Sequence, residues 1–97
     1  MYPKILFFSS EFCPPCRKAE KMVKEINFSL FGAKLEVEKI NIENEMKRAQ
    51  QHGVQKVPTI IVGEHRISTI VDREQLVDVI LQGIMSSIKL NGKEKPI

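Results

Sequence analysis

The stretch SSEFCPPCR, residues 9–17, holds both cysteines of the 97-residue chain. It lies between an apolar run at residues 5–8 and a helix-period pattern that begins near Pro15. Cys13 and Cys16 are therefore predicted at a strand-to-helix junction, where free backbone N–H groups and the helix dipole favour a thiolate over a thiol. Because the thiolate attacks disulfides and a second sulfur follows three residues later, the stretch predicts thiol–disulfide exchange.

A single C-x-x-C motif is also compatible with half of a zinc site or with a structural disulfide. Zinc needs two further ligands, and the spacing of His52 and His65 from the cysteines fits no common zinc motif. A static disulfide between Cys13 and Cys16 closes a loop too short to stabilise much through chain entropy. Redox chemistry is the preferred interpretation, and no metal is expected.

The length and composition are those of one ordinary globular domain. A chain of 97 residues with 42% hydrophobic and 28% charged residues can build a core without metals or several disulfides. We expect a single domain at residues 1–88. The polar segment 89–97 contains a glycine and a proline, so we expect it to be a flexible tail.

The charge pattern does not favour nucleic-acid binding. The formal net charge is +3, and the chain has one Tyr and no Trp for stacking on bases. Lysines cluster in the first predicted helix, but Glu20 and Glu25 interleave with them, which is typical of a solvated helix face. We expect a monomer that does not bind nucleic acid.

The N-terminal residues run directly into an apolar strand, without the succession of regions that marks a signal peptide. No apolar run approaches the roughly 18 residues that span a bilayer. We therefore expect a cytoplasmic protein that does not enter the membrane, a setting in which a lone C-x-x-C motif is usually catalytic.

Hydrophobic periodicity predicts the order β-α-β-α-β-β-α. Residues 4–8, which contain the apolar run 5–8, are expected to form a central strand, and residues 15–28 an amphipathic helix that is followed by a break near Gly32. Residues 35–42 alternate as a strand, and Asn44 is expected to cap a short helix at residues 45–52.

A hairpin and a long helix complete the predicted fold. The apolar residues 57–62 and the strand 65–69 are separated by Gly63 and Glu64, which favour a type II′ turn. Asp72 is expected to cap the last helix, with Gln75 three residues later. The expected buried stripe of that helix comprises Leu76, Val79, Ile80, Ile84 and Ile88.

Three segments resemble the thioredoxin superfamily. The CPPC motif at residues 13–16 resembles the redox motif that thioredoxins usually carry as W-C-G-P-C-K, KINIE at 39–43 resembles K-L-N-I-D, and HGVQKVPT at 52–59 resembles Y-G-I-R-G-I-P-T. The likeness covers about residues 4–88, although the extra N-terminal strand and helix of thioredoxins are missing. It implies a glutaredoxin-sized, thioredoxin-like α/β fold, with a four-stranded mixed sheet ordered 2-1-3-4 and helices on both faces.

The resemblance also implies roles for the residues around the cysteines. Cys13 would attack a target disulfide, Cys16 would resolve the mixed disulfide, and Pro15 would support the loop between them. The resemblance further implies a cis bond between Val57 and Pro58 beside the cysteines. The residues expected to contact substrate are Val57, Pro58, Phe12 and Pro14.

Two positions near the predicted site remain to be considered, Lys39 and Phe7. Lys39 lies on the same face of its predicted strand as apolar residues and resembles a partly buried family lysine beneath the active site, although a lysine reaching to solvent would look the same. Thioredoxins carry a buried aspartate where this chain has Phe7. The proton acceptor of Cys16 is therefore open, with Glu11 and Glu43 as guesses.

The leading hypothesis is a thiol–disulfide oxidoreductase that reduces disulfides in target proteins. The resemblance implies that a flavin-dependent thioredoxin reductase reduces it and that it needs no cofactor of its own. A glutathione-dependent glutaredoxin is an alternative, although the segment before the last helix keeps Asp72 and lacks the glycine pair of glutaredoxins. A non-enzymatic binding module is a second alternative, against which both cysteines argue.

Overall fold

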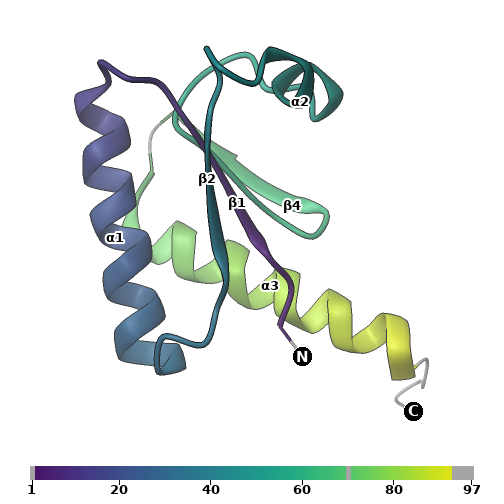
Figure 1. The fold of residues 1–97 in the computed structure, drawn as a ribbon. Helices are drawn as coiled ribbons and strands as arrows, with labels where there is room; N and C mark the ends of the chain where they lie inside the picture. Colours follow the sequence, from purple (N-terminus) through teal and green to yellow (C-terminus); the bar gives the residue numbers. More distant parts are fainter. Residues whose placement is uncertain (1, 70, 93–97) are drawn as a thin grey trace.

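The computed structural model describes residues 2–69 and 71–92, with side chains as far as residue 87. Seven elements follow one another in the predicted order β-α-β-α-β-β-α (Figure 1). They are β1 (Ile5–Ser9), α1 (Pro14–Phe31), β2 (Val37–Asn41), α2 (Met46–Gln51), β3 (Thr59–Val62), β4 (His65–Ser68) and α3 (Arg73–Gly92).

The four strands form one mixed sheet in the order β2-β1-β3-β4, which confirms the predicted order. Strand β1 pairs in parallel with β2 and antiparallel with β3, and β3 pairs antiparallel with β4. Gly63 in the β3–β4 turn has a φ of +63°, the left-handed value that the first central residue of a type II′ turn requires. Strand β2, which carries Lys39, is an edge strand.

Helices cover both faces of the sheet, as predicted. On one face, α1 and α3 pack against Ile5 and Phe7 of β1. On the other face, Ala49 of α2 packs with Phe8, Ile40 and Ile61. Because β1 is covered on both sides, Ile5, Phe7 and Phe8 are buried and Leu6 is only partly exposed, which explains why the apolar run is continuous.

Helix α1 is longer than the sequence pattern predicted. It begins at Pro14, continues three residues beyond the expected end at 28, and stops at Gly32, whose φ of +59° is left-handed. The amide of Asn27 fixes the following turn, since it donates to the Leu35 carbonyl at 3.0 Å and accepts from the Leu35 N–H at 2.9 Å. These bonds join the last turns of α1 to the chain entering β2.

The expectation that Asn44 caps α2 is wrong. The Asn41 side chain instead accepts from the backbone N–H groups of Glu43, at 2.8 Å, and Asn44, at 3.4 Å. Helix α2 then starts after Glu45 without a side-chain cap. Asn41 is the last residue of β2, so its short side chain folds over the turn that leaves the sheet.

Helix α3 begins as predicted, because the Asp72 carboxylate accepts from the backbone N–H of Gln75 at 3.4 Å. Leu76, Ile80 and Ile84 are buried as expected, Val79 is only partly buried, and the side chain of Ile88 lies outside the described residues. The helix continues to Gly92, four residues past the expected boundary at 88, and residues 93–97 lie outside the described part. Among the helices that are described, none has the length and apolar character needed to span a membrane.

Candidate active site

The two cysteines form a disulfide at the head of α1. Cys13 is the N-cap residue, its Cα lies 5.2 Å from that of Cys16, and its sulfur accepts the Cys16 backbone N–H at 3.1 Å. The junction of β1 and α1 therefore places the Cys13 sulfur against a backbone N–H of the first helical turn, as the sequence predicted, and the same N–H also donates to the Cys13 carbonyl at 3.0 Å. Such a donor stabilises negative charge on that sulfur.

The neighbours of the disulfide differ in exposure. Cys13 is 8% exposed and Cys16 is 3% exposed, so Cys13 is the more accessible of the two by a narrow margin. Phe12 is 86% exposed immediately before the pair. Pro14 and Pro15, both exposed, occupy the first helical positions, where the missing N–H of proline costs no hydrogen bond.

The loop before β3 lies against the same core as the cysteines. The bond between Val57 and Pro58 is cis, as the resemblance implied. Pro58 is fully buried, and half-buried Val57 packs against the core cluster that contains both cysteines. The Pro58 carbonyl accepts the Thr69 N–H at 2.8 Å, which ties this loop to the segment leading into α3.

An apolar groove lies along α1 beside the disulfide, with a volume of about 480 Å³. We call it the apolar groove. Its lining residues come from the first turns of α1 and from the segment before α3, and they are Pro14, Pro15, Lys18, Ala19, Met22, Thr69 and Val71.

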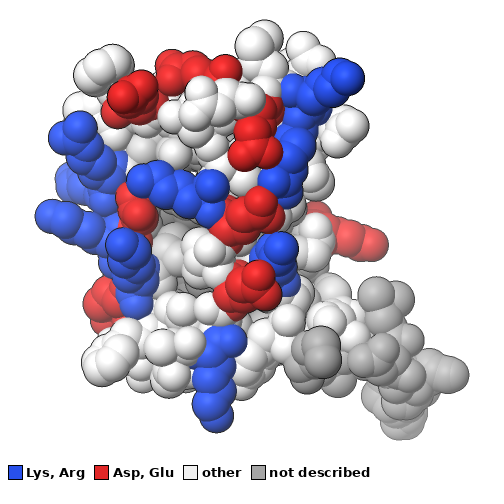
Figure 2. Space-filling model, viewed as in Figure 1, with Lys and Arg blue, Asp and Glu red and all other residues white. Residues whose placement is uncertain are grey.

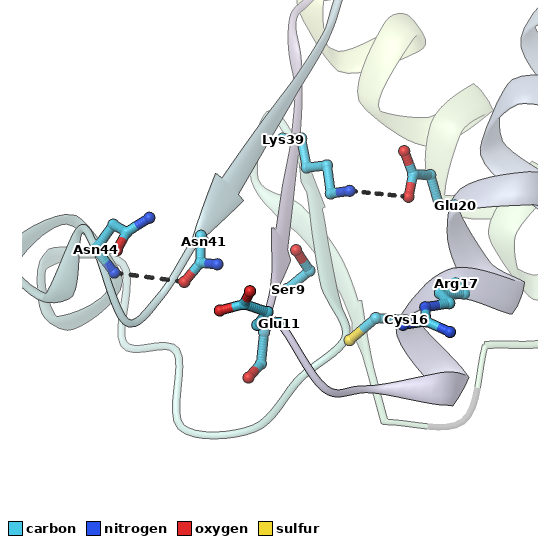
Figure 3. A pocket seen from close by; sticks show the side chains of 9 residues that line it. Ser9, Glu11, Cys16, Arg17, Glu20, Lys39, Asn41 and Asn44 are labelled. Atoms are coloured by element: carbon cyan, nitrogen blue, oxygen red, sulfur yellow. Dashed lines mark hydrogen bonds and ion pairs between the residues drawn. The ribbon is translucent and has the colours of Figure 1, made fainter.

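A second hollow, of about 380 Å³, reaches Cys16 from another side of α1 (Figure 3). We call it the polar pocket. Apart from Cys16, every residue that lines it carries a charged, hydroxyl or amide side chain: Ser9, Ser10, Glu11, Arg17, Glu20, Lys39, Asn41 and Asn44. The buried sulfur of Cys16 thus lies at the wall of a polar, solvent-connected space.

Lys39 enters the polar pocket from β2 and meets Glu20 of α1. The Lys39 ammonium lies 3.1 Å from a Glu20 carboxylate oxygen (Figure 3). The Lys39 side chain is 58% exposed, more than the partly buried position that the resemblance implied, because β2 is an edge strand. Sequence reasoning missed Glu20, although its position four residues after Cys16, on one side of a helix, was a usable signal.

Charged neighbours hold Glu20 in its ionised form. Burial would raise the pKa of Glu20, but the hydrogen bond and positive charge of Lys39, together with Lys24 at 3.5 Å, outweigh burial and hold the pKa below its ordinary value. The carboxyl group is therefore a carboxylate at neutral pH.

Glu11 and Glu43, the proton acceptors suggested by the sequence, have less contact with the polar pocket and its charged residues than Glu20 has. Glu11 lines the polar pocket from an exposed loop position. Glu43 does not line the pocket and accepts a hydrogen bond from the Ser10 hydroxyl at 2.9 Å. Phe7, where the family aspartate would stand, is 1% exposed within the same apolar cluster as Cys16.

The histidines lie apart from the sulfurs. The His52 ring lies against Phe8, tilted by 54° with 5.5 Å between ring centroids, and His65 shares a hydrogen bond with Ser86 at 3.1 Å. Within residues 2–69 and 71–92, no three His, Cys, Asp or Glu side chains gather in a way that could hold a metal ion.

Surface charge is distributed unevenly around the site. In Figure 2, Lys and Arg side chains gather on the left, over α1, whereas acidic and basic side chains alternate across the centre of the view. Among the residues of α1, Arg17, Lys18 and Lys21 are exposed close to the disulfide. Glu11 and Glu20 line the polar pocket beside Cys16 as well, so charges of both signs surround the cysteine pair.

A cysteine pair at the head of a helix, beside a cis-proline loop on this four-stranded sheet, defines a thiol–disulfide oxidoreductase of the thioredoxin fold. Residues 2–82 match the family described as Thioredoxin. The chain belongs to the thioredoxin family.

Relatives and solved structures agree with this assignment. A thioredoxin of Methanocaldococcus jannaschii is 35% identical over 78 residues, which cover 79% of this chain and 91% of that protein. A probable thioredoxin of Methanothermobacter marburgensis is 37% identical over 81 residues, covering 82% and 94%. The solved structure of a mutant thioredoxin from Halobacterium salinarum is 25% identical, with a TM-score of 0.69 and coverage of 82% of this chain and 73% of that one.

The family membership gives the activity. The protein is a thioredoxin-type thiol–disulfide oxidoreductase, a protein-disulfide reductase with a C-x-x-C redox pair. Disulfide-containing target proteins follow from this homology.

Proposed function

We propose that Cys13 attacks the target disulfide, that Cys16 resolves the mixed disulfide, and that the target docks in the apolar groove. The Cys13 thiolate bonds to one target sulfur, and the other target sulfur leaves as a thiolate. The Cys16 thiolate then bonds to the Cys13 sulfur, and the second target sulfur leaves. Two electrons pass from the cysteine pair to the target, whose two thiolates take up protons.

The observation that carries this order is the position of Cys13 as the N-cap of α1. Its sulfur faces a backbone N–H donor at 3.1 Å, and the exposed Phe12 precedes it on the surface. Cys16 lies one turn inside the helix and is less exposed. The first sulfur is thus the better placed to meet a large partner.

Docking uses the residues around the opening of the groove. Phe12 and Pro14 are exposed beside the disulfide, and Pro14 lines the groove. Val57 and Pro58 lie in the neighbouring loop, against the core that holds the sulfurs. An extended target segment that pairs with the backbone of this loop would bring its disulfide to Cys13.

Two further residues support the exchange without bonding to the target. Pro15, with its neighbour Pro14, restricts the backbone between the cysteines because the proline ring fixes φ. Lys39 brings a positive charge into the polar pocket beside Cys16. That charge favours the Cys16 thiolate during the second step.

We further propose a flavin-dependent thioredoxin reductase as electron donor, so that flavin and nicotinamide belong to the partner and the chain acts without a cofactor. The cytoplasm is the compartment in which such a reductant chain keeps dithiols reduced. Fractionation of the source cells should recover the protein with cytoplasmic markers, and recovery with an extracellular or membrane fraction would contradict this location.

Reduction of insulin disulfides by dithiothreitol tests the cysteine roles. The protein should accelerate precipitation of the insulin chains, and Cys13→Ser should bring the rate to background. Limited iodoacetamide labelling of the reduced protein, followed by mass spectrometry of peptides, should modify Cys13 before Cys16. Preferential labelling of Cys16 would reverse the assigned roles.

The reductant is tested separately. Reduced nicotinamide cofactor with thioredoxin reductase should sustain turnover, whereas glutathione with glutathione reductase should not. Turnover with glutathione as the sole reductant would favour the glutaredoxin alternative. If neither reductant sustains turnover although a thiol assay shows that both cysteines are reduced, the result would favour the non-enzymatic binding module.

A further inference from the structure

The resolving step requires an acceptor for the Cys16 proton. In the proposed order, which this inference takes as its basis, Cys16 starts as a thiol and must attack as a thiolate. Cys16 is 3% exposed and lies in a cluster with Phe7 and other apolar side chains, none of which can accept a proton. The acceptor must therefore lie on another side of the sulfur.

The polar pocket is the side from which an acceptor can reach Cys16. Its volume of about 380 Å³ is large enough for several water molecules, and its hydroxyl, amide and charged walls can bind them. Figure 3 shows the Cys16 side chain leaving α1 toward this space, with the side chains of Ser9 and Glu11 nearby. A proton can thus leave Cys16 without crossing the apolar core.

Glu20 is the carboxylate best placed in this pocket. It follows Cys16 by four residues in α1, and side chains at that spacing stand on one side of a helix with Cβ atoms roughly 6 Å apart. The Glu20 side chain is 27% exposed and is held by Lys39 at 3.1 Å and Lys24 at 3.5 Å. Glu11, the other pocket carboxylate, lies on an exposed loop and forms no ion pair within residues 2–69 and 71–92.

We propose that Glu20 accepts the Cys16 proton through water in the polar pocket, with Lys39 holding the Glu20 carboxylate in position. The Cys16 S–H bond breaks and a Glu20 O–H bond forms, while the Cys16 electron pair bonds to the Cys13 sulfur. The bond between Cys13 and the target sulfur breaks, and the target leaves as a thiolate. Glu20 then returns its proton to the leaving thiolate or to solvent.

The surrounding charges set the protonation state of Glu20. Lys39 and Lys24 keep Glu20 ionised before the step, and Arg17 adds a further positive group to the pocket wall. A negative charge on Cys16 or Glu11 in the same pocket would raise the proton affinity of Glu20. Glu20 and Cys16 are therefore expected to titrate as a coupled pair, in which one proton is shared between them.

The test separates the two exchange steps in time. Reduced protein is mixed with one equivalent of an aromatic disulfide that releases a coloured thiolate, first on Cys13 attack and then on Cys16 resolution. In Glu20→Gln, the first release should be unchanged and the second should slow by about 10- to 100-fold at pH 7, the usual range for loss of a positioned proton acceptor. An unchanged second release would overturn the proposal.

The pH profile distinguishes proton transfer from a structural effect. Sharing of one proton between Glu20 and Cys16 makes the second release nearly independent of pH through neutrality in the native protein. In Glu20→Gln the same rate should rise about tenfold per pH unit, because only free thiolate then reacts. A flat profile in Glu20→Gln, or a tenfold slope already present in the native protein, would contradict the assigned role.

Three variants complete the design. Glu20→Asp should keep the flat profile at a reduced rate, and Lys39→Met should move the lower end of the flat region to higher pH, since Lys39 lowers the pKa of Glu20. Glu25→Gln is the matched control, because Glu25 is another ion-paired carboxylate of α1, bound to Arg73 outside the pocket. A steep pH profile in Glu25→Gln would show that the effect is not specific to Glu20.

Failure of the native protein to release the first thiolate would instead contradict the proposed order of the cysteines.

Discussion

The apolar groove and the polar pocket border the same disulfide but differ in chemistry. Successive residues of an α-helix turn by about 100°, so Cys16, Arg17 and Glu20 face the polar pocket while Lys18 and Met22 line the apolar groove on the other side of α1. This difference shows how the two sides of one helix can serve two steps of disulfide exchange. The groove suits contact with a target, whereas the pocket suits movement of a proton.

The different origins of the two hollows explain their polarity. The polar pocket opens beside the edge strand β2, whose outward side chains remain accessible to water. The apolar groove lies between α1 and the segment that leads into α3, which also packs against the main core through Val71. Solvent therefore has access to Cys16 from the sheet edge, while apolar surface is available beside Cys13.

The largest expected effect comes from removing the sulfur on the pocket side. When pre-reduced Cys16→Ser is mixed with insulin in the absence of dithiothreitol, Cys13 can still attack but nothing resolves the product, so complete reduction of an insulin disulfide should fall to background and a mixed disulfide with insulin should accumulate. Mass spectrometry under non-reducing conditions measures the adduct, and Cys13→Ser serves as the control that should form none. Release of reduced insulin by Cys16→Ser without a mixed disulfide would show that Cys16, on the polar-pocket side, is not needed for the resolving step.

A change far from both hollows should lower stability and leave the comparison intact. A Cβ added at Gly83 of α3 would lie 2.7 Å from the Val62 carbonyl oxygen and 2.8 Å from the Val62 Cβ, so helix and strand would have to separate. Gly83→Ala should reduce the free energy of unfolding by about 1–3 kcal/mol, the usual range for an overpacked core, as measured by urea denaturation.

The control for this prediction is Gly53→Ala, which meets no atom within 4 Å but carries a φ of +66°. Gly53→Ala should lose stability only because alanine disfavours this left-handed backbone conformation. Both variants, assayed where they remain folded, should keep the native rates of both exchange steps. If Gly83→Ala slowed only one of the two exchange steps, the contact between α3 and β3 would have to affect the apolar groove or the polar pocket.

A smaller effect is expected from making the groove polar. Met22 is half-buried and lines the groove, so Met22→Gln should lower kcat/KM for a protein disulfide by about tenfold, equivalent to about 1.4 kcal/mol of lost apolar contact. Reaction with a small disulfide should be unchanged. The matched control is Met46→Gln, because Met46 is 61% exposed on α2 and lines neither hollow. Equal losses for large and small disulfides would contradict docking in the groove.

The smallest expected effect concerns β2, the edge strand that borders the polar pocket. Hydrogen bonds from Arg48 at 2.6 and 3.1 Å, aided by Lys4, outweigh desolvation and lower the pKa of Glu38 to about 2 from an ordinary 4.5. Since the folded pKa is the lower one, this pair stabilises the fold above about pH 4.5 and its contribution is lost as the pH falls toward 2.

Glu38→Gln should therefore be slightly less stable than the native protein at pH 7 and should lose less stability between pH 4.5 and 2. Urea midpoints measured across this range test the prediction. Glu36→Gln is the control, because Glu36 is 74% exposed and lies 3.6 Å from Lys4. Identical acid profiles for the native protein and Glu38→Gln would show that the ion pair does not contribute measurably.

Local signals in the sequence predicted the elements and the redox pair. The apolar run of β1, the position of Gly32 at the end of α1 and the turn at Gly63 depend on the chemistry of a few adjacent residues, and the structure confirms each of them. Helix ends were less predictable. Helix α1 runs three residues past its predicted end, and Asn27 near that end bonds to Leu35 in the following loop, a contact that periodicity within the helix does not contain.

The sequence by itself determined that two cysteines stand at the start of a helix, because strand and helix periods and the C-x-x-C spacing are properties of neighbouring residues. Only the tertiary structure decided which charges meet beside the second sulfur. Glu20 and Lys39 are separated by 19 positions, and their contact at 3.1 Å depends on the parallel pairing of β1 with β2 and on the packing of α1 against that sheet. Such meetings arise from the packing of whole elements, which no local pattern of residues specifies.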